Sequence, residues 1–239
     1  MPGPNVKKPS ERLLKMHSKQ SLKQPPILYS LQHCPYAMRA RMGILLAKQP
    51  VMLRAIVLKN KPDEMLQLSN KGTVPVLVVD ESQVIDESLD IMLWALSQSD
   101  PDNLLYKENT EKLAEMLSLI NRFDNEFKEN LEKYKCAKRY HEKSLTDNRK
   151  QCETLIIELE RRLEQHNFII GETLSLADYA ILPFVRQFAR VERQWYLQSP
   201  YPSLQRWLKT HLQSKVFSKA MTKFPLWLDS GESFLIGSD

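Results

Sequence analysis

Residues 27–42 decide the fold of this chain, and they read Ile-Leu-Tyr-Ser-Leu-Gln-His-Cys-Pro-Tyr-Ala-Met-Arg-Ala-Arg-Met. The apolar run 27–31 predicts a buried strand. Pro35 predicts the start of a helix, because the N–H that proline lacks has no partner in the first helical turn. Cys34 then becomes the helix N-cap, where free N–H groups and the helix dipole favour a reactive thiolate. A buried, inert cysteine is the alternative, but the strand–Cys–Pro–helix setting favours reactivity.

The segments that follow predict a small α/β domain over residues 26–98. A helix over 35–48 and a strand over 51–57 complete a parallel βαβ unit with the first strand. The apolar residues 76–79 and 84–85 predict a hairpin. A further helix is expected over 88–98.

The remainder of the chain predicts helices. The polar segment 97–102 contains Pro101 and is typical of a linker. From Leu104 onward, apolar residues recur with a helical period over 108–133 and 146–166. We therefore expect residues 104–239 to form an all-helical domain.

Ser175 and Asp178 have the spacing of a capping box at the start of another helix. We expect a structural role for both residues, and a catalytic role for Asp178 is the less favoured interpretation. Pro183 lies inside this helix and is expected to kink it.

The composition excludes several classes of function. The net charge of the 239-residue chain is +5, and residues 1–24 alone account for it, so the rest has no net field that would favour nucleic acid. We expect residues 1–25 to be a basic, flexible extension. Without a long apolar run no membrane span is expected, and three cysteines do not make a disulfide framework, which favours a reducing cytoplasm.

Five motifs together carry a family resemblance: CPYAMRARM at 34–42, LKNKP at 58–62, TVPVL at 73–77, DES at 86–88 and GETLSLADYAILPF at 171–184. In order and spacing the chain resembles the cytosolic glutathione transferases, most closely their omega-like, cysteine-containing class. The resemblance implies a thioredoxin-like N-terminal domain followed by an all-helical C-terminal domain. It also implies a cis peptide bond before Pro75, glutathione bound beside Cys34, and a homodimer, although omega-like interfaces vary.

The resemblance assigns a role to individual residues. Cys34 is the expected catalytic residue. The expected glutathione-binding residues are Pro35, Tyr36, Lys61, Val74, Pro75, Glu87 and Ser88. Lys61 would meet the glycine-end carboxylate, the Val74 backbone would pair with the cysteinyl part, and Glu87 and Ser88 would hold the γ-glutamyl end. Taken singly, Lys61 is more typical of a solvated lysine, and Glu87 and Ser88 of helix caps.

The chemistry follows from a missing second thiol. Two-cysteine redox enzymes carry it three residues after the first, where this chain has Ala37. We therefore expect a monothiol reaction through a Cys34–glutathione mixed disulfide, of the dehydroascorbate reductase or deglutathionylation type, with glutathione as cosubstrate and a small electrophile or disulfide as acceptor. The alternatives are glutathione conjugation, with Tyr29, Ser30 or Tyr36 as the group that stabilises the thiolate, and a non-catalytic adaptor.

Four further expectations concern the surroundings of the site. Arg39 and Arg41 add positive potential near Cys34, but for Arg41 a surface or interdomain charge is preferred. His33 precedes the thiol and is not favoured as its partner. The second-substrate pocket is expected between the domains, near Phe184 and Phe188, with Tyr134, Tyr140, Trp195 and Tyr196 as further candidates. No metal site is expected, because Cys136, Cys152 and His141 lack zinc-binding spacing.

Overall fold

The computed structural model describes residues 24–238, so most of the predicted basic extension lies outside the described residues. The chain divides into two compact units. The described part of the first unit comprises residues 24–101 and 220–238, and the second unit is Asp102–Lys219.

The first unit contains the predicted βαβ arrangement. Strand β1 (Ile27–Ser30) pairs in parallel with β2 (Val51–Ala55), and α2 (Pro35–Leu46) connects them. The predicted hairpin is also present, because β3 (Val76–Val78) pairs antiparallel with β4 (Val84–Ile85). The short helix α3 (Asp63–Leu68) precedes the hairpin, and α4 (Ser88–Gln98) follows it. The sheet has the order β4-β3-β1-β2-β5.

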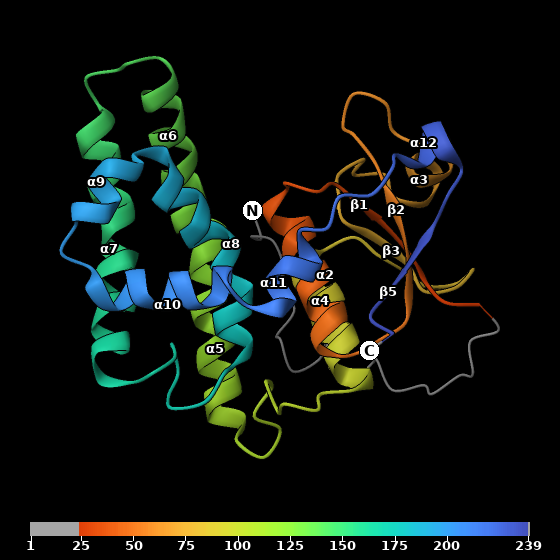
Figure 1. Cartoon of the computed structure of the whole chain (residues 1–239), viewed down its shortest axis with the longest axis horizontal. Coiled ribbons are helices and arrows are strands. Elements are labelled where there is room, and N and C mark those ends of the chain that lie inside the picture. Colours follow the sequence, from red (N-terminus) through yellow and green to blue (C-terminus); the bar gives the residue numbers. More distant parts are fainter. Residues whose placement is uncertain (1–23, 239) are drawn as a thin grey trace, which may run out of the picture. The chain divides into compact units, whose positions relative to one another are not determined.

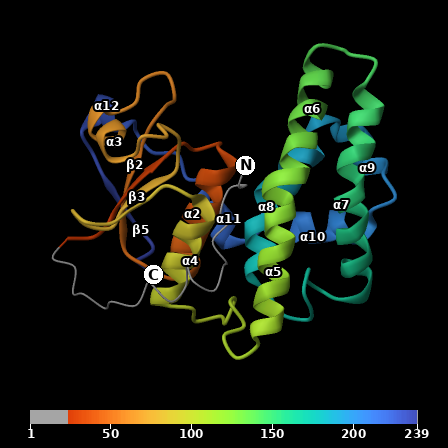
Figure 2. The ribbon, with the colours of Figure 1, turned by 180° about the vertical axis from the view of Figure 1, so that it is seen from behind.

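Helices α2 and α4 lie side by side on one face of the sheet (Figures 1 and 2). Their close approach depends on Gly43, because a Cβ atom there would lie 2.8 Å from the Cα of Met92. An apolar cluster joins β1, β3 and α3 through buried Tyr29, Val76 and Met65, and Cys34 packs against this cluster.

The last strand corrects the predicted domain boundary. Residues 104–239 were expected to be entirely helical, but β5 (Phe234–Ile236) pairs antiparallel with β2 and belongs to the first unit. Phe234 lies opposite Leu53, and Ile236 lies opposite Val51. The edge of β2 has backbone groups that need partners, and residues far along the chain supply them.

We call residues 220–238 the C-terminal strap. It contains the short helix α12 (Trp227–Ser230) ahead of β5, and Leu226 forms a parallel bridge with Ala55. Near its end, Gly237 has a φ of +74°, and a Cβ atom there would lie 2.1 Å from the carbonyl oxygen of Gln49. A glycine is therefore required where the strap passes this backbone.

The second unit is helical, as predicted. Its elements are α5 (Thr110–Arg122), the π-helical turn η1 (Phe123–Phe127), α6 (Lys128–Arg139), α7 (Leu145–Gln165), α8 (Leu176–Val191), α9 (Arg193–Gln198) and α10 (Pro202–Leu212), and α11 (Lys215–Ala220) leads into the strap. Helix α10 packs against α7 and α8 (Figure 2). Among residues 24–238, no helix is both long enough and apolar enough to cross a bilayer.

The predicted capping box at Ser175 and Asp178 is confirmed at the start of α8. The buried Asp178 carboxylate accepts hydrogen bonds from the Ser175 amide (3.0 Å) and hydroxyl (2.6 Å), the Ile169 amide (3.1 Å) and the Trp207 indole (2.8 Å). These bonds join the α7–α8 connection, α8 and α10. Asp178 therefore has the structural role expected of it.

Candidate functional site

Cys34 occupies the predicted N-cap of α2, with Pro35 at the first helical position. Its backbone is extended (φ −71°, ψ 126°), and its carbonyl oxygen accepts a 2.9 Å bond from the Met38 amide. The Cys34 amide donates to the Leu31 carbonyl oxygen at 3.3 Å. The partly exposed Cys34 side chain thus lies at the N-terminal, electropositive end of α2.

The peptide bond between Val74 and Pro75 is cis, as the resemblance implied. The Sγ atom of Cys34 lies 3.8 Å from the carbonyl oxygen of Val74. Two segments that are distant in sequence therefore meet at the thiol. Just ahead of β3, the Cys34 sulfur thus lies beside a backbone carbonyl of an extended segment.

Lys61 lies in the loop before α3 and is partly buried. Its Nζ atom lies 3.7 Å from the position of a Cβ atom built on Gly72, so the lysine and this glycine turn are neighbours. Lys61 takes part in none of the ion pairs among residues 24–238 that the structure describes.

Glu87 and Ser88 begin α4, with Glu87 at the N-cap position. Ser88 is buried, and the Nη1 atom of Arg39 lies 3.5 Å from its hydroxyl oxygen. Glu87 is exposed and accepts a 2.5 Å hydrogen bond from Lys71 Nζ. The bond to Glu87 raises the pKa of Lys71 above its usual value.

The sequence motifs did not single out Lys71 or Ser69. Lys71 Nζ lies 3.2 Å from an Asp86 oxygen as well, and the Ser69 hydroxyl donates to the same carboxylate at 2.9 Å. The segment before β3 and the start of α4 are thus held together by charge. The only sequence signal was that Lys71 and the DES motif carry opposite charges, and charge alone does not specify contact across the intervening β3–β4 hairpin.

The preferred expectation for Arg41 was wrong. It is neither a surface nor an interdomain charge, because its side chain is buried within the first unit. Its guanidinium bonds to the β1–α2 loop and to the strap. A charged residue on an apolar helix gives no sequence signal for such partners.

Tyr29 packs as a strand residue should and is poorly placed as the alternative thiolate-stabilising group. Its hydroxyl donates to Glu64 at 2.7 Å and accepts from Arg54 at 2.8 Å. Burial, with the Glu64 bond as a further cause, raises the pKa of Tyr29 to about 12. Tyr36, also proposed for glutathione, lies in the first turn of α2 and is partly buried.

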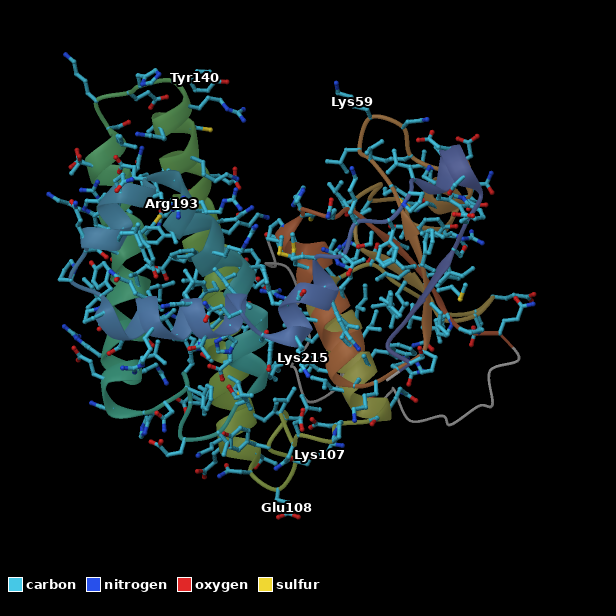
Figure 3. All side chains as sticks on the ribbon, viewed as in Figure 1. Lys59, Lys107, Glu108, Tyr140, Arg193 and Lys215 are labelled. Atoms are coloured by element: carbon cyan, nitrogen blue, oxygen red, sulfur yellow. The ribbon has the colours of Figure 1, made fainter. Side chains whose placement is uncertain are left out.

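The aromatic candidates of the helical unit mostly serve its core. Tyr134, Phe184, Phe188 and Tyr196 are buried, whereas Tyr140 is 67% exposed and projects from the end of α6 (Figure 3). The Arg149 guanidinium lies over the partly buried Trp195 ring, with its Cζ atom 4.1 Å from the ring centroid. These contacts favour packing for all but Tyr140.

The other two cysteines differ from Cys34 in setting. Cys136 is exposed, and Cys152 is fully buried in α7, where burial raises its thiol pKa to about 12. No group of three or more histidine, cysteine or acidic residues suited to a metal ion occurs within residues 24–238.

Comparison with known proteins agrees with this fold. Residues 28–103 match the family described as "Glutathione S-transferase, N-terminal domain", and residues 136–210 match "Glutathione S-transferase, C-terminal domain". Glutaredoxin 2 of Escherichia coli K12 is 31% identical over 41% of this chain and 45% of its own length. Glutathione S-transferase omega-1 of Mus musculus is 24% identical over 80% of this chain and 78% of its own length.

Solved structures show the same architecture. A glutathione transferase family member from Pseudomonas fluorescens Pf-5, with two glutathione molecules bound, superposes with a TM-score of 0.73. It is 16% identical, and the alignment covers 85% of this chain and 95% of that one. A thioredoxin-like domain with a mixed sheet, followed by a helical domain, defines the class of protein. The chain belongs to the glutathione S-transferase family.

Proposed function

We propose that the protein is a glutathione-dependent thiol transferase that acts through a mixed disulfide between Cys34 and glutathione. The main support is the placement of Cys34 at the N-cap of α2, with its Sγ atom 3.8 Å from the Val74 carbonyl oxygen. Ala37 occupies the position at which a two-cysteine enzyme has its resolving cysteine. The likeness to glutaredoxin 2 and to omega-class transferases supports thiol chemistry over other reactions of the family. Free cysteines are compatible with action in a reducing compartment such as the cytoplasm.

Glutathione is the cosubstrate in this proposal, and the first unit offers chemistry for each of its parts. The Lys61 ammonium suits the glycine-end carboxylate. The backbone of Val74 suits the peptide of the cysteinyl part. Glu87 suits the γ-glutamyl ammonium, and the start of α4 at Ser88 suits the γ-glutamyl carboxylate. Pro35, Tyr36 and Pro75 complete the proposed surroundings of the ligand.

The reaction has two thiol–disulfide exchanges. The Cys34 thiolate attacks the glutathione sulfur of a mixed disulfide, forms a Cys34–glutathione disulfide and releases the acceptor as a thiolate, which takes up a proton. A second glutathione thiolate then attacks the glutathione sulfur of that adduct, which regenerates the Cys34 thiolate and releases glutathione disulfide. In total, the sulfur of the incoming glutathione is oxidised and the acceptor sulfur is reduced, while the glutathionyl sulfur of the substrate stays at the disulfide level.

Incubation with glutathione disulfide followed by mass spectrometry of the intact protein tests the proposal. We expect one glutathione adduct, mapped to Cys34 and absent from Cys34→Ala. Cys136→Ser is the matched control, because this exposed thiol lies in the helical unit and its loss should leave the adduct in place.

The same preparations separate the alternatives. Conjugation of glutathione to a halogenated nitrobenzene that survives in Cys34→Ala would favour a conjugating transferase. A protein that neither forms the adduct nor binds glutathione would be an adaptor on this fold, and the proposal would fail.

A further inference from the structure

Arg41 is a buried cation whose hydrogen-bond partners are all neutral. Its side chain is on α2, and the residue is 3% exposed. Nη1 donates to the Ser30 hydroxyl (2.5 Å) and to the Leu31 carbonyl (3.1 Å), Nη2 donates to the Gln32 carbonyl (2.6 Å), and Nε donates to the Ala220 carbonyl (2.7 Å). One guanidinium therefore fixes the last residue of β1, the first two residues of the β1–α2 loop and the start of the strap.

This network reaches Cys34 through one shared atom. The Leu31 carbonyl oxygen accepts from Arg41 Nη1 and also from the Cys34 amide, at 3.3 Å. Gln32 adds a second tie, because its side-chain amide donates to the Met221 carbonyl at 3.0 Å. The position of the Cys34 backbone thus depends on the guanidinium through the carbonyl oxygen that both residues share.

No carboxylate compensates the charge of Arg41 within these contacts. A pocket of about 430 Å³ lies beside the guanidinium, and none of its lining residues is acidic. Burial lowers the pKa of Arg41 to about 10, and an ionised Cys34 acts in the opposite direction.

We propose that Arg41 is a positioning residue for Cys34, whose guanidinium both fixes the β1–α2 loop and stabilises the Cys34 thiolate with an otherwise uncompensated charge. The inference rests on the proposed role of Cys34 as the nucleophile. A buried charge without an anionic partner is costly, which makes the thiolate its natural counterpart.

Other charged groups on the neighbouring elements have different partners or are exposed. Arg39 on α2 bonds to Ser88. Arg54 of β2 pairs with Glu64 of α3 and with Tyr29 of β1. At the start of α4, Asp86 and Glu87 pair with Lys71. His33, Lys59 and Lys223 are exposed, and Lys61 is partly buried. Their influence on the thiol is retained when Arg41 alone is replaced.

The test is the pH dependence of Cys34 alkylation by iodoacetamide, measured by peptide mass spectrometry in a Cys136→Ser background. In Arg41→Gln, which removes the charge, we expect the pH of half-maximal rate to rise by at least about one unit. Arg41→Lys keeps a charge but loses the fork of donors, so its midpoint should stay near the parent value. Urea unfolding of each variant reports whether the unit is folded under the assay conditions.

An unchanged midpoint in folded Arg41→Gln would overturn the electrostatic role, because a purely structural contribution would alter the rate without moving the midpoint. If Arg41→Gln does not fold, the parent protein gives the answer. The rate ratio of anionic iodoacetate to neutral iodoacetamide at Cys34 should exceed that of N-acetylcysteine severalfold, and an equal or smaller ratio overturns the proposal. None of these reactions involves glutathione, so their failure leaves the mixed-disulfide experiment intact.

Discussion

The guanidinium of Arg54 lies over the indole ring of Trp227, with the Cζ atom 3.9 Å from the ring centroid. Arg54 is on β2, and Trp227 begins α12 in the C-terminal strap. The Arg54 Nη1 atom also lies 2.7 Å from Glu64 Oε1, and Nε lies 3.2 Å from the Ser233 hydroxyl. One arginine therefore joins a central strand, α3 and two points of the strap.

This relationship predicts the effect of Trp227→Ala on the first unit. The replacement removes the cation–π contact and part of the apolar cluster that includes Met65, so we expect the free energy of unfolding to fall by about 2 kcal/mol. Urea unfolding measures the change. Leu228→Ala is the control, because this neighbour in α12 is 47% exposed and its truncation should cost no more than about 0.5 kcal/mol. Equal effects of the two substitutions would contradict the strap's anchoring role.

Asp178→Ala should destabilise the helical unit far more than Ser175→Ala. Loss of the carboxylate leaves the buried Ile169 amide and Trp207 indole without their acceptor, and we expect a cost of about 3 kcal/mol or more. Loss of the Ser175 hydroxyl removes one arm of the capping box and should cost about 1 kcal/mol. Chemical unfolding followed by circular dichroism compares the two variants, and similar losses would show that the network contributes less than its geometry implies.

Glu87→Gln should weaken binding of S-methylglutathione, a ligand that cannot form a disulfide. The neutral amide no longer attracts the γ-glutamyl ammonium, and we expect about a tenfold rise in Kd by calorimetry. The matched control is Glu81→Gln, which removes an exposed carboxylate after β3. If Glu87→Gln binds the ligand as tightly as the parent protein, Glu87 does not contact glutathione. Its role is then limited to the ion pair with Lys71.

His211 predicts a pH dependence of stability. Burial lowers the pKa of the ring below 6.5, although the bond to the Trp207 carbonyl and the charge of Asp178 oppose the shift. Below pH 6.5 the unfolded chain takes up a proton that the native ring resists, so the unfolded state binds more protons and stability falls as pH decreases through this window. The slope approaches about 1.4 kcal/mol per pH unit for one proton.

His211→Gln should remove this component of the slope between pH 6.5 and the lower folded-state pKa. His166→Gln is the comparison, because His166 is exposed and bonded to Glu172. Urea unfolding at several pH values gives the slope of the free energy of unfolding against pH. If His211→Gln has the same slope as the parent protein, groups other than His211 cause the acid sensitivity.

Local signals in the sequence were sufficient for much of the fold. Pro35 correctly predicted where α2 begins, and the Ser175–Asp178 spacing correctly predicted the cap of α8. The π-helical turn at Phe123–Phe127 lies within one long predicted helix, because the four-residue spacing of Phe123 and Phe127 matches an ordinary helical period. The strand at Phe234–Ile236 was missed, because three residues are too few to show alternation and their partner lies far away in sequence.

The candidate site likewise contains residues that the sequence predicted and residues that it did not. Cys34 and the neighbourhood of Val74 followed from motifs, and the structure brings them together at 3.8 Å. Arg41 could not be placed, because its four acceptors include three backbone carbonyls, and a carbonyl carries no residue identity. Lys71 was missed for a related reason, since ion pairs formed across a hairpin depend on geometry that opposite charges alone do not fix.

The origin of β5 also determines the order in which the protein acquires its structure on the ribosome. The strand that completes the sheet is encoded after the entire helical unit, so a nascent chain long enough to fold residues 24–101 still has β2 as an open edge. Newly made protein must keep that edge from pairing with other chains until translation has passed residue 236.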